Sequence, residues 1–186
     1  GGPKGVGALV VRRGVDLAPR LLGGGQERGL RAGTQNVAGA VALAVAARLA
    51  ASERVDTLAR VQALRARLVA GLRASVPGLV ETVPGATEPA SGGRLVDGGG
   101  VVPGICHVCI PDVESEALLY LLERDGVYAS AASSCVSGAM EPSHVLAAMG
   151  VDRRLAAGAL RLSLGNTTDA EVDHALAVIP ATSPAG

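Results

Sequence analysis

The sequence alternates between short apolar runs next to turn residues and longer segments whose apolar residues recur at helical spacing. Short apolar runs of this kind predict strands at residues 8–12, 79–83, 105–110 and 159–164. The helical segments are expected at residues 35–52, 56–72, 113–124, 143–149 and 168 to about 179. This order of strands and helices indicates an α/β or α+β fold in which helices cover a sheet.

Several residues are expected to define where helices begin. Thr34 is placed as the N-cap of a buried Ala-rich helix, and Asp112 as the cap of the helix at 113–124. Thr168 and Glu171 have the spacing of a capping box. The Gly-rich segment 22–33 and the Gly/Pro/Ser-rich segment 84–100 are expected to be loops.

Charge and composition exclude several classes of function. The 186 residues include 17 basic and 17 acidic ones, so the chain lacks the surplus of positive charge that nucleic-acid binding requires. With two Tyr and no Phe or Trp, it also lacks stacking platforms for bases. The longest apolar stretch, 37–47, is too short to span a membrane, and three Cys fit a reducing compartment. A soluble, cytoplasmic protein with no membrane partner is expected.

The Gly-rich segment that ends at Thr34 has the composition of an anion-binding loop. Free N–H groups and the positive end of the dipole at a helix N-terminus favour phosphate. Thr34 would add its hydroxyl, and Arg28 or Arg31 a positive charge. On these grounds alone, the simpler interpretation is that Thr34 only caps its helix and the glycines only turn the chain.

Cys135 lies among very small residues, in the segment 129–139. Small neighbours leave a thiol accessible, as a nucleophile requires, whereas a structural Cys is usually buried as a hydrophobe. A small filler in a tight turn explains the composition equally well. His144 is expected to be a surface residue and not the base that activates Cys135, because no Asn or Asp motif completes a triad.

Arg161 follows the alternation of the expected strand at 159–164. Leu160, Leu162 and Leu164 share one face, so Arg161 lies with Ser163 on the other. An Arg at such a position can bind a carboxylate through two hydrogen bonds, although a plain surface Arg is the commoner case.

Cys106, His107 and Cys109 resemble a metal or redox motif at first sight. On a strand, residues three apart face opposite sides, so Cys106 and Cys109 cannot share a disulfide or a metal ion. His107 and Cys109 share a face, but two ligands do not make a zinc site. These residues are therefore expected to serve in packing.

Five stretches in this order resemble the second half of a cysteine desulfurase, a pyridoxal-phosphate-dependent enzyme of the class V aminotransferase family. They are GGPKGVGALVVRR (1–13), GGGQERGLRAGTQNV (23–37), VESEALLYLL (113–122), SSCVSGAMEPSHVLAAMG (133–150) and LRLSLGNTT (160–168). The resemblance implies part of a fold-type I transferase. Residues 1–50 would end the large cofactor domain, and residues 51–186 would form the small domain.

The resemblance also implies a role for one residue in each of three segments: the Gly-rich loop, the segment 129–139 and the strand at 159–164. Cys135 would take the sulfur of L-cysteine as a persulfide, leaving L-alanine. Arg161 would bind the substrate carboxylate, and Thr34 would reach the cofactor phosphate of the partner subunit in a homodimer. The sulfur would pass to an acceptor or iron–sulfur scaffold protein. No resident metal is implied, only a transient iron–sulfur contact through Cys135.

The sequence departs from the family pattern beside the cysteine and at the lysine. Ser134 and Val136 stand where the family usually has Ala and Thr or Ser, and the segment 84–100 is longer than usual. The only lysine, Lys4, matches the second lysine of the family's Ser-x-His-Lys…Gly-Pro-Lys-Gly run. The lysine that holds the cofactor would precede Gly1, so the chain is interpreted as a C-terminal half.

Three alternatives remain open at this point. A selenocysteine lyase, or another class V aminotransferase-type enzyme, would share the fold without using Cys135 in this way. A non-catalytic fragment or assembly module would need no cofactor lysine. A thiol or zinc role for the three cysteines is the weakest alternative.

Overall fold

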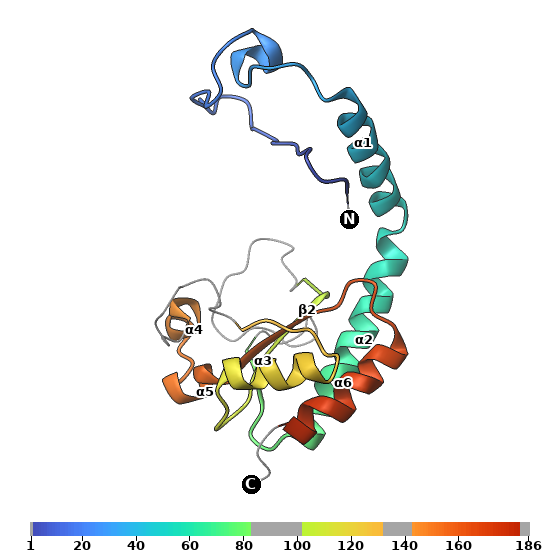
Figure 1. Cartoon of the computed structure of the whole chain (residues 1–186), viewed down its shortest axis with the longest axis vertical. Coiled ribbons are helices and arrows are strands. Elements are labelled where there is room, and N and C mark those ends of the chain that lie inside the picture. The colour runs from blue at the N-terminus through green and yellow to red at the C-terminus, as the bar shows by residue number, and fades with distance from the viewer. Residues whose placement is uncertain (1, 83–101, 132–142, 183–186) are drawn as a thin grey trace. The chain divides into compact units, whose positions relative to one another are not determined.

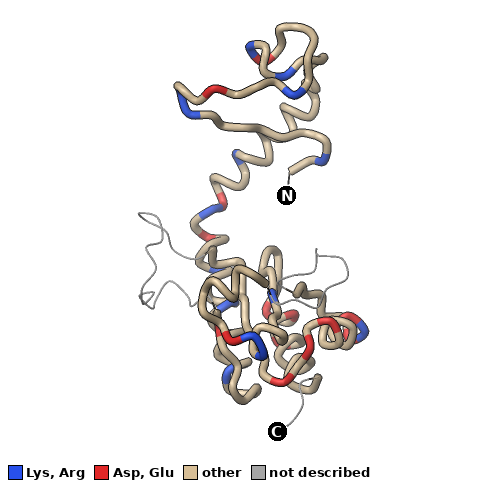
Figure 2. Tube along the Cα trace, turned by 90° about the vertical axis from the view of Figure 1, so that its left-hand side faces the viewer, with Lys and Arg blue, Asp and Glu red and all other residues tan. Residues whose placement is uncertain are grey.

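The computed structural model describes residues 2–82, 102–131 and 143–182 (Figure 1). The predicted loop at 84–100 and the segment around Cys135 lie outside the described residues. The chain divides into two compact units, Gly1–Val55 and Asp56–Gly186. The assignment of these parts to a large and a small domain stays a prediction. Figure 2 shows basic and acidic residues interspersed in both units, in keeping with the zero net charge.

The first unit contains a 3₁₀ turn, η1 (Gln26–Gly29), and one long helix, α1 (Val37–Ser52). The prediction that Thr34 caps this helix is wrong. Asn36 is the N-cap, because its side-chain oxygen accepts a hydrogen bond of 3.0 Å from the Gly39 N–H. Thr34 lies two residues outside the cap, so its hydroxyl is not used in starting the helix.

The predicted burial of α1 is also wrong. No residue of the helix is buried. Its apolar residues form an i, i+4 stripe, and their exposed fractions run from 41% at Val45 to 67% at Val37. An apolar composition predicts burial only if another element covers the stripe, and no described residue of this unit does so.

The predicted strand at 8–12 does not form. Leu9 and Val10 are 78% and 95% exposed, and the segment has no regular structure. A strand requires a hydrogen-bonded neighbour, and none of the described segments pairs with this one. The apolar composition alone was therefore a misleading signal.

The second unit is built on a three-stranded antiparallel sheet in the order β1-β2-β3 (Figure 1). The strands are β1 (Val80–Glu81), β2 (Ile105–Cys109) and β3 (Ala159–Ser163). These confirm the three predicted strands, each shorter than expected. The register sets His107 of β2 opposite Arg161 of β3.

One face of the sheet is covered by three helices, α2 (Arg54–Ser75), α3 (Ser115–Arg124) and α6 (Asp169–Thr182). Their apolar residues pack with those of β2 and β3 in one core, whose most deeply buried members are Leu68, Leu72, Leu118, Leu122, Val108, Leu160 and Ile179. Gly71 lies inside α2, where a Cβ atom would come within 2.5 Å of the Leu176 side chain. The absence of a side chain at Gly71 thus lets α6 approach α2 closely.

Two helix starts differ from the predictions. Asp112 does not cap α3: it adopts a left-handed conformation (φ 55°), and the helix begins at Ser115. The Ser115 hydroxyl lies within hydrogen-bonding distance of two carbonyls, those of Ala157 (2.6 Å) and Ala159 (2.8 Å). The capping box of α6 is confirmed. The Thr168 N–H donates to Glu171 Oε2 (2.7 Å), and the Glu171 N–H donates to Thr168 Oγ1 (3.3 Å).

Two short helices form a smaller cluster near one end of the sheet. These are α4 (His144–Ala148), which was expected, and α5 (Arg153–Ala157), which was not. The cluster contains Leu146 of α4, Ala156 of α5, and Cys109 and Ala159 from the strands.

A buried ion pair joins α2 to the edge of the sheet. Glu81 of β1 pairs with Arg65 of α2, and their side chains are only 4% and 8% exposed. Arg65 Nε also donates to the Ile105 carbonyl (2.9 Å), and the half-exposed Arg73 reaches the other Glu81 oxygen (2.9 Å). One carboxylate thus links the helix to β1, and Arg65 extends the link to β2.

No helix among residues 2–82, 102–131 and 143–182 combines the length and the apolar composition needed to cross a membrane.

Candidate active site

The sheet face away from α2, α3 and α6 carries four polar side chains in register. Thr82 lies beside His107, because its N–H donates to the His107 carbonyl (3.1 Å). His107 faces Arg161, and Arg161 forms an antiparallel bridge with Ser130. Directly opposed residues of neighbouring strands point to the same face. We call Thr82, His107, Arg161 and Ser130 the polar row.

Arg161 lies where the strand alternation predicted. Leu160 and Leu162 are buried against the helices, while Arg161 is exposed on the opposite face. Its backbone is fixed by two hydrogen bonds with Ser130: the Arg161 N–H donates over 2.8 Å, and the Ser130 N–H donates back over 3.0 Å. Among the described residues no carboxylate pairs with its guanidinium. The side chain is thus available to an external anion.

His107 is buried but hydrogen-bonded, which the packing interpretation of this residue did not foresee. Its Nδ1 atom lies 2.5 Å from the Thr82 hydroxyl oxygen. Burial lowers the pKa of His107, and the neighbouring Arg161 charge lowers it further. The imidazole is therefore neutral at neutral pH, and the polar row carries the single positive charge of Arg161.

Cys106 and Cys109 lie on opposite faces of β2, as the alternation predicted. Cys106 belongs to the core under the helices, and Cys109 belongs to the cluster with Leu146 and Ala156. Burial raises the pKa of both thiols to about 11, so both stay protonated at neutral pH. The described part of the chain contains no group of three or more residues able to hold a metal ion.

We expect native protein treated with iodoacetamide near pH 8 to remain unmodified at Cys106 and Cys109. The thiolate is the nucleophile, and a thiol with a pKa of about 11 supplies on the order of one thiolate in a thousand at that pH. Peptide mass mapping after short exposure measures the labelling, and the same reaction in denaturant, which should label all three cysteines, is the control. Rapid native labelling of either strand cysteine would contradict this.

Cys135 lies outside the described residues, so its predicted role stays a prediction. In the sequence, Cys135 follows Ser130 by five residues.

The loop before α1 is closed by hydrogen bonds on both sides of Thr34. The Gly33 N–H donates to Gln26 Oε1 (3.3 Å), and Gln35 Nε2 donates to Glu27 Oε1 (3.0 Å). The Thr34 hydroxyl makes no hydrogen bond to any residue that the structure describes, and it lies just before the N-terminus of α1. Thr34 belongs to the first unit and Arg161 to the second.

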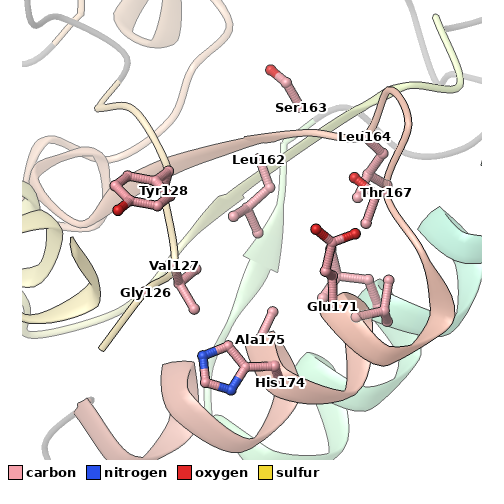
Figure 3. Close-up of a pocket in the computed structure, with 12 residues that line it drawn as sticks. Gly126, Val127, Tyr128, Leu162, Ser163, Leu164, Thr167, Glu171, His174 and Ala175 are labelled. Carbon is pink, nitrogen blue, oxygen red and sulfur yellow. The ribbon is translucent and has the colours of Figure 1, made fainter. Parts of the chain in front are cut away.

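A separate cavity of about 200 Å³ lies between β3, the segment 126–128 and α6 (Figure 3). Arg161 and His107 do not line it. Two of its polar side chains already have partners: Glu171 caps α6 through Thr168, and His174 Nε2 is hydrogen-bonded to the Asp125 carbonyl (2.8 Å). The cavity is therefore distinct from the polar row.

The sequence and the fold can be compared with those of known proteins. The model of the family described as aminotransferase class V matches residues 1–174. The chain therefore belongs to the class V aminotransferase family, and its mixed helix and strand architecture agrees with that family.

Several of the proteins to which the chain is similar are named cysteine desulfurases. An IscS-like cysteine desulfurase of Mycobacterium tuberculosis is 44% identical over 181 residues, covering 97% of this chain and 43% of the relative. A cysteine desulfurase of Gluconacetobacter diazotrophicus is 46% identical over 181 residues, covering 96% and 42%. The solved structure of a NifS-like protein superposes with a TM-score of 0.76 at 38% identity, covering 97% and 42%. The chain thus spans about two fifths of the length of the relatives it matches.

These comparisons confirm the predicted fold class and the resemblance to cysteine desulfurases. The sequence did not reveal Thr82 and Ser130 as neighbours of Arg161, and it assigned His107 to packing alone. The only signal for His107 was the alternation of β2, which put it on the face opposite the core. The register that joins four separate segments is not a local property of the sequence.

Proposed function

We propose that this chain is the C-terminal part of a pyridoxal-phosphate-dependent cysteine desulfurase. The reaction converts L-cysteine to L-alanine and leaves the sulfur as a persulfide on Cys135. The observation that carries the proposal is the polar row, in which Arg161 has no carboxylate partner among the described residues. Its backbone is fixed to Ser130, which precedes Cys135 by five residues in the sequence. The proposal is supported by relatives named cysteine desulfurase that are 40–46% identical over nearly the whole chain.

We assign to Arg161 the binding of the substrate carboxylate. A guanidinium binds a carboxylate through two parallel hydrogen bonds, which fixes both position and orientation. The exposed side chain, without an acidic partner among the described residues, suits this role. Because the Arg161 backbone is held by Ser130 on one side and β2 lies on the other, its Cα position is well defined.

We assign to Thr34 the binding of the cofactor phosphate in the partner subunit of a homodimer. The residues present fit a phosphate: the Thr34 hydroxyl has no described partner, the N-terminus of α1 follows directly, and Arg28 and Arg31 lie in the same loop. When bound, pyridoxal phosphate supplies the electron sink that weakens the bonds to the substrate α-carbon. The only lysine in this sequence is Lys4, so we assign the cofactor lysine to a segment upstream of Gly1.

We assign to Cys135 the role of accepting the sulfur of the substrate. Its thiolate attacks the sulfur of the substrate, and the substrate C–S bond breaks, with its electron pair left on the carbon that becomes the methyl group of L-alanine. Cys135 then carries the sulfur as a persulfide to an acceptor or an iron–sulfur scaffold protein. Cys106 and Cys109 do not suit this role, because burial keeps their thiols protonated. A reducing, cytoplasmic location would keep the Cys135 thiol from forming a disulfide.

The proposal is tested with protein that includes the upstream segment, loaded with pyridoxal phosphate. We expect L-cysteine to yield L-alanine and, with a reductant present, one sulfide per alanine. Amino acid analysis and sulfide determination measure the two products. Turnover of selenocysteine without turnover of cysteine would instead identify a selenocysteine lyase. Amino transfer to an oxo acid without sulfide release would identify an aminotransferase.

A further inference from the structure

His107 is the closest cross-strand neighbour of Arg161. The Arg161 N–H and carbonyl both bond to Ser130, on the side away from β2. The facing residues His107 and Arg161 therefore form a non-hydrogen-bonded pair, the type that brings Cα atoms to about 4.5 Å and side chains closest together. The influence of the Arg161 charge on the pKa of His107 agrees with this proximity.

One ring nitrogen of His107 has a hydrogen-bond partner, and the other has none among the described residues. Nδ1 lies 2.5 Å from Thr82 Oγ1, whereas Nε2 has no hydrogen-bond partner among the described residues. In this part of the chain no fully buried side-chain nitrogen or oxygen lacks a partner. The unpartnered Nε2 must therefore reach the surface of the sheet face that carries Arg161.

The Thr82 contact decides which nitrogen carries the proton. The hydroxyl oxygen lies 2.5 Å from Nδ1 and 3.3 Å from the His107 carbonyl. We assign the hydroxyl proton to the shorter contact, so Nδ1 accepts and the neutral ring carries its own proton on Nε2. The polar row then presents a guanidinium and an imidazole N–H side by side, and neither is paired with a carboxylate among the described residues.

We propose that His107 is a substrate-binding residue, which donates an Nε2–H hydrogen bond to the carboxylate held by Arg161. The pair would select amino acids that carry a free α-carboxylate over amines that lack it. Thr82 is the positioning residue that fixes the ring and its proton. This inference rests on the proposed function, because that function assigns the carboxylate to Arg161.

The test compares two ligands that differ only in the carboxylate, L-alanine and ethylamine. Their equilibrium dissociation constants are measured from the change in cofactor absorbance, with protein that includes the upstream segment. His107→Leu keeps the side-chain volume and removes the donor, so we expect L-alanine to bind about tenfold more weakly. Ethylamine should bind within about twofold of its original affinity, since it makes no contact with His107.

Three further variants separate binding from folding. His107→Gln retains an N–H donor and should bind L-alanine within about threefold of the original affinity. Thr82→Val, at a half-buried surface position, should weaken L-alanine binding in the same direction but less than His107→Leu. His174→Gln changes a histidine that does not belong to the polar row, and it should leave both ligands unaffected.

The inference is overturned if His107→Leu weakens both ligands equally, because a purely structural residue would act that way. It is also overturned if L-alanine binding is unchanged in both His107→Leu and Thr82→Val. If His107→Leu does not fold, the inference is tested by the L-alanine affinities of Thr82→Val and His107→Gln. Turnover of L-cysteine by the unchanged protein is measured in parallel. If that activity is absent, the proposed function is wrong. If it is present and the binding results contradict the expectation, only the inference about His107 is wrong.

Discussion

Cys135→Ser is expected to abolish persulfide formation and to lower sulfide release by more than about a thousandfold, in protein that includes the upstream segment. The hydroxyl of serine is not ionised at neutral pH and cannot hold the transferred sulfur as a persulfide. Binding of cofactor and substrate should remain, because Thr34 and Arg161 are unchanged. Intact-protein mass spectrometry after a single exposure to L-cysteine shows whether one sulfur atom has been added.

The matched control for this experiment is Cys109→Ala, which removes a buried thiol two residues from His107. It should leave persulfide formation intact, since Cys109 lies in an apolar cluster and its thiol stays protonated. Unaltered cofactor absorbance in Cys135→Ser confirms that the variant is folded and loaded. If that variant releases sulfide at the original rate, Cys135 is not the sulfur acceptor and the proposed mechanism is wrong.

Glu81→Ala is expected to destabilise the fold by about 3–5 kcal/mol. The Glu81 side chain is 4% exposed, and its removal breaks the ion pair with the Arg65 guanidinium, whose side chain is 8% exposed. Desolvation of a charge is offset only while its partner is present, so breaking the pair costs more than the pair contributes. Denaturant unfolding followed by circular dichroism measures the change as a lower midpoint at constant slope.

Two variants calibrate that measurement. Replacing both charges, with Arg65→Met and Glu81→Leu together, should recover much of the loss because no buried charge remains. Arg67→Ala removes two exposed ion pairs, with Asp169 and Asp173, whose side chains are 82% and 62% exposed. This change should cost less than about 1 kcal/mol. A Glu81→Ala protein no less stable than Arg67→Ala would show that the buried pair does not hold α2 to the sheet.

The elements predicted correctly are those whose signals are local. The helical period of α2, the alternation of β2 and the capping box at Thr168 each depend on residues within one element. The errors concern features that depend on neighbours. The segment 8–12 has the composition of a strand without a pairing partner, and α1 has the composition of a buried helix without a described cover. The short helix α5 is too brief to show a period.

The candidate site divides in the same way. That Arg161 points away from the core follows from the alternation of one strand. Its neighbours depend on the register among segments up to 79 residues apart in the sequence. These neighbours are His107, Thr82 and Ser130. Strand register is set by the packing of the whole sheet against its helices, so no pattern within one segment predicts it.

The close approach of α6 to α2 at Gly71 has an evolutionary consequence. A Cβ atom at Gly71 would meet the side chain of Leu176, so the residue at one position limits the choice at the other. Lineages that acquire a larger residue at position 71 should carry a smaller or differently branched one at position 176. In an alignment of related chains, these two positions, 105 residues apart, are expected to covary.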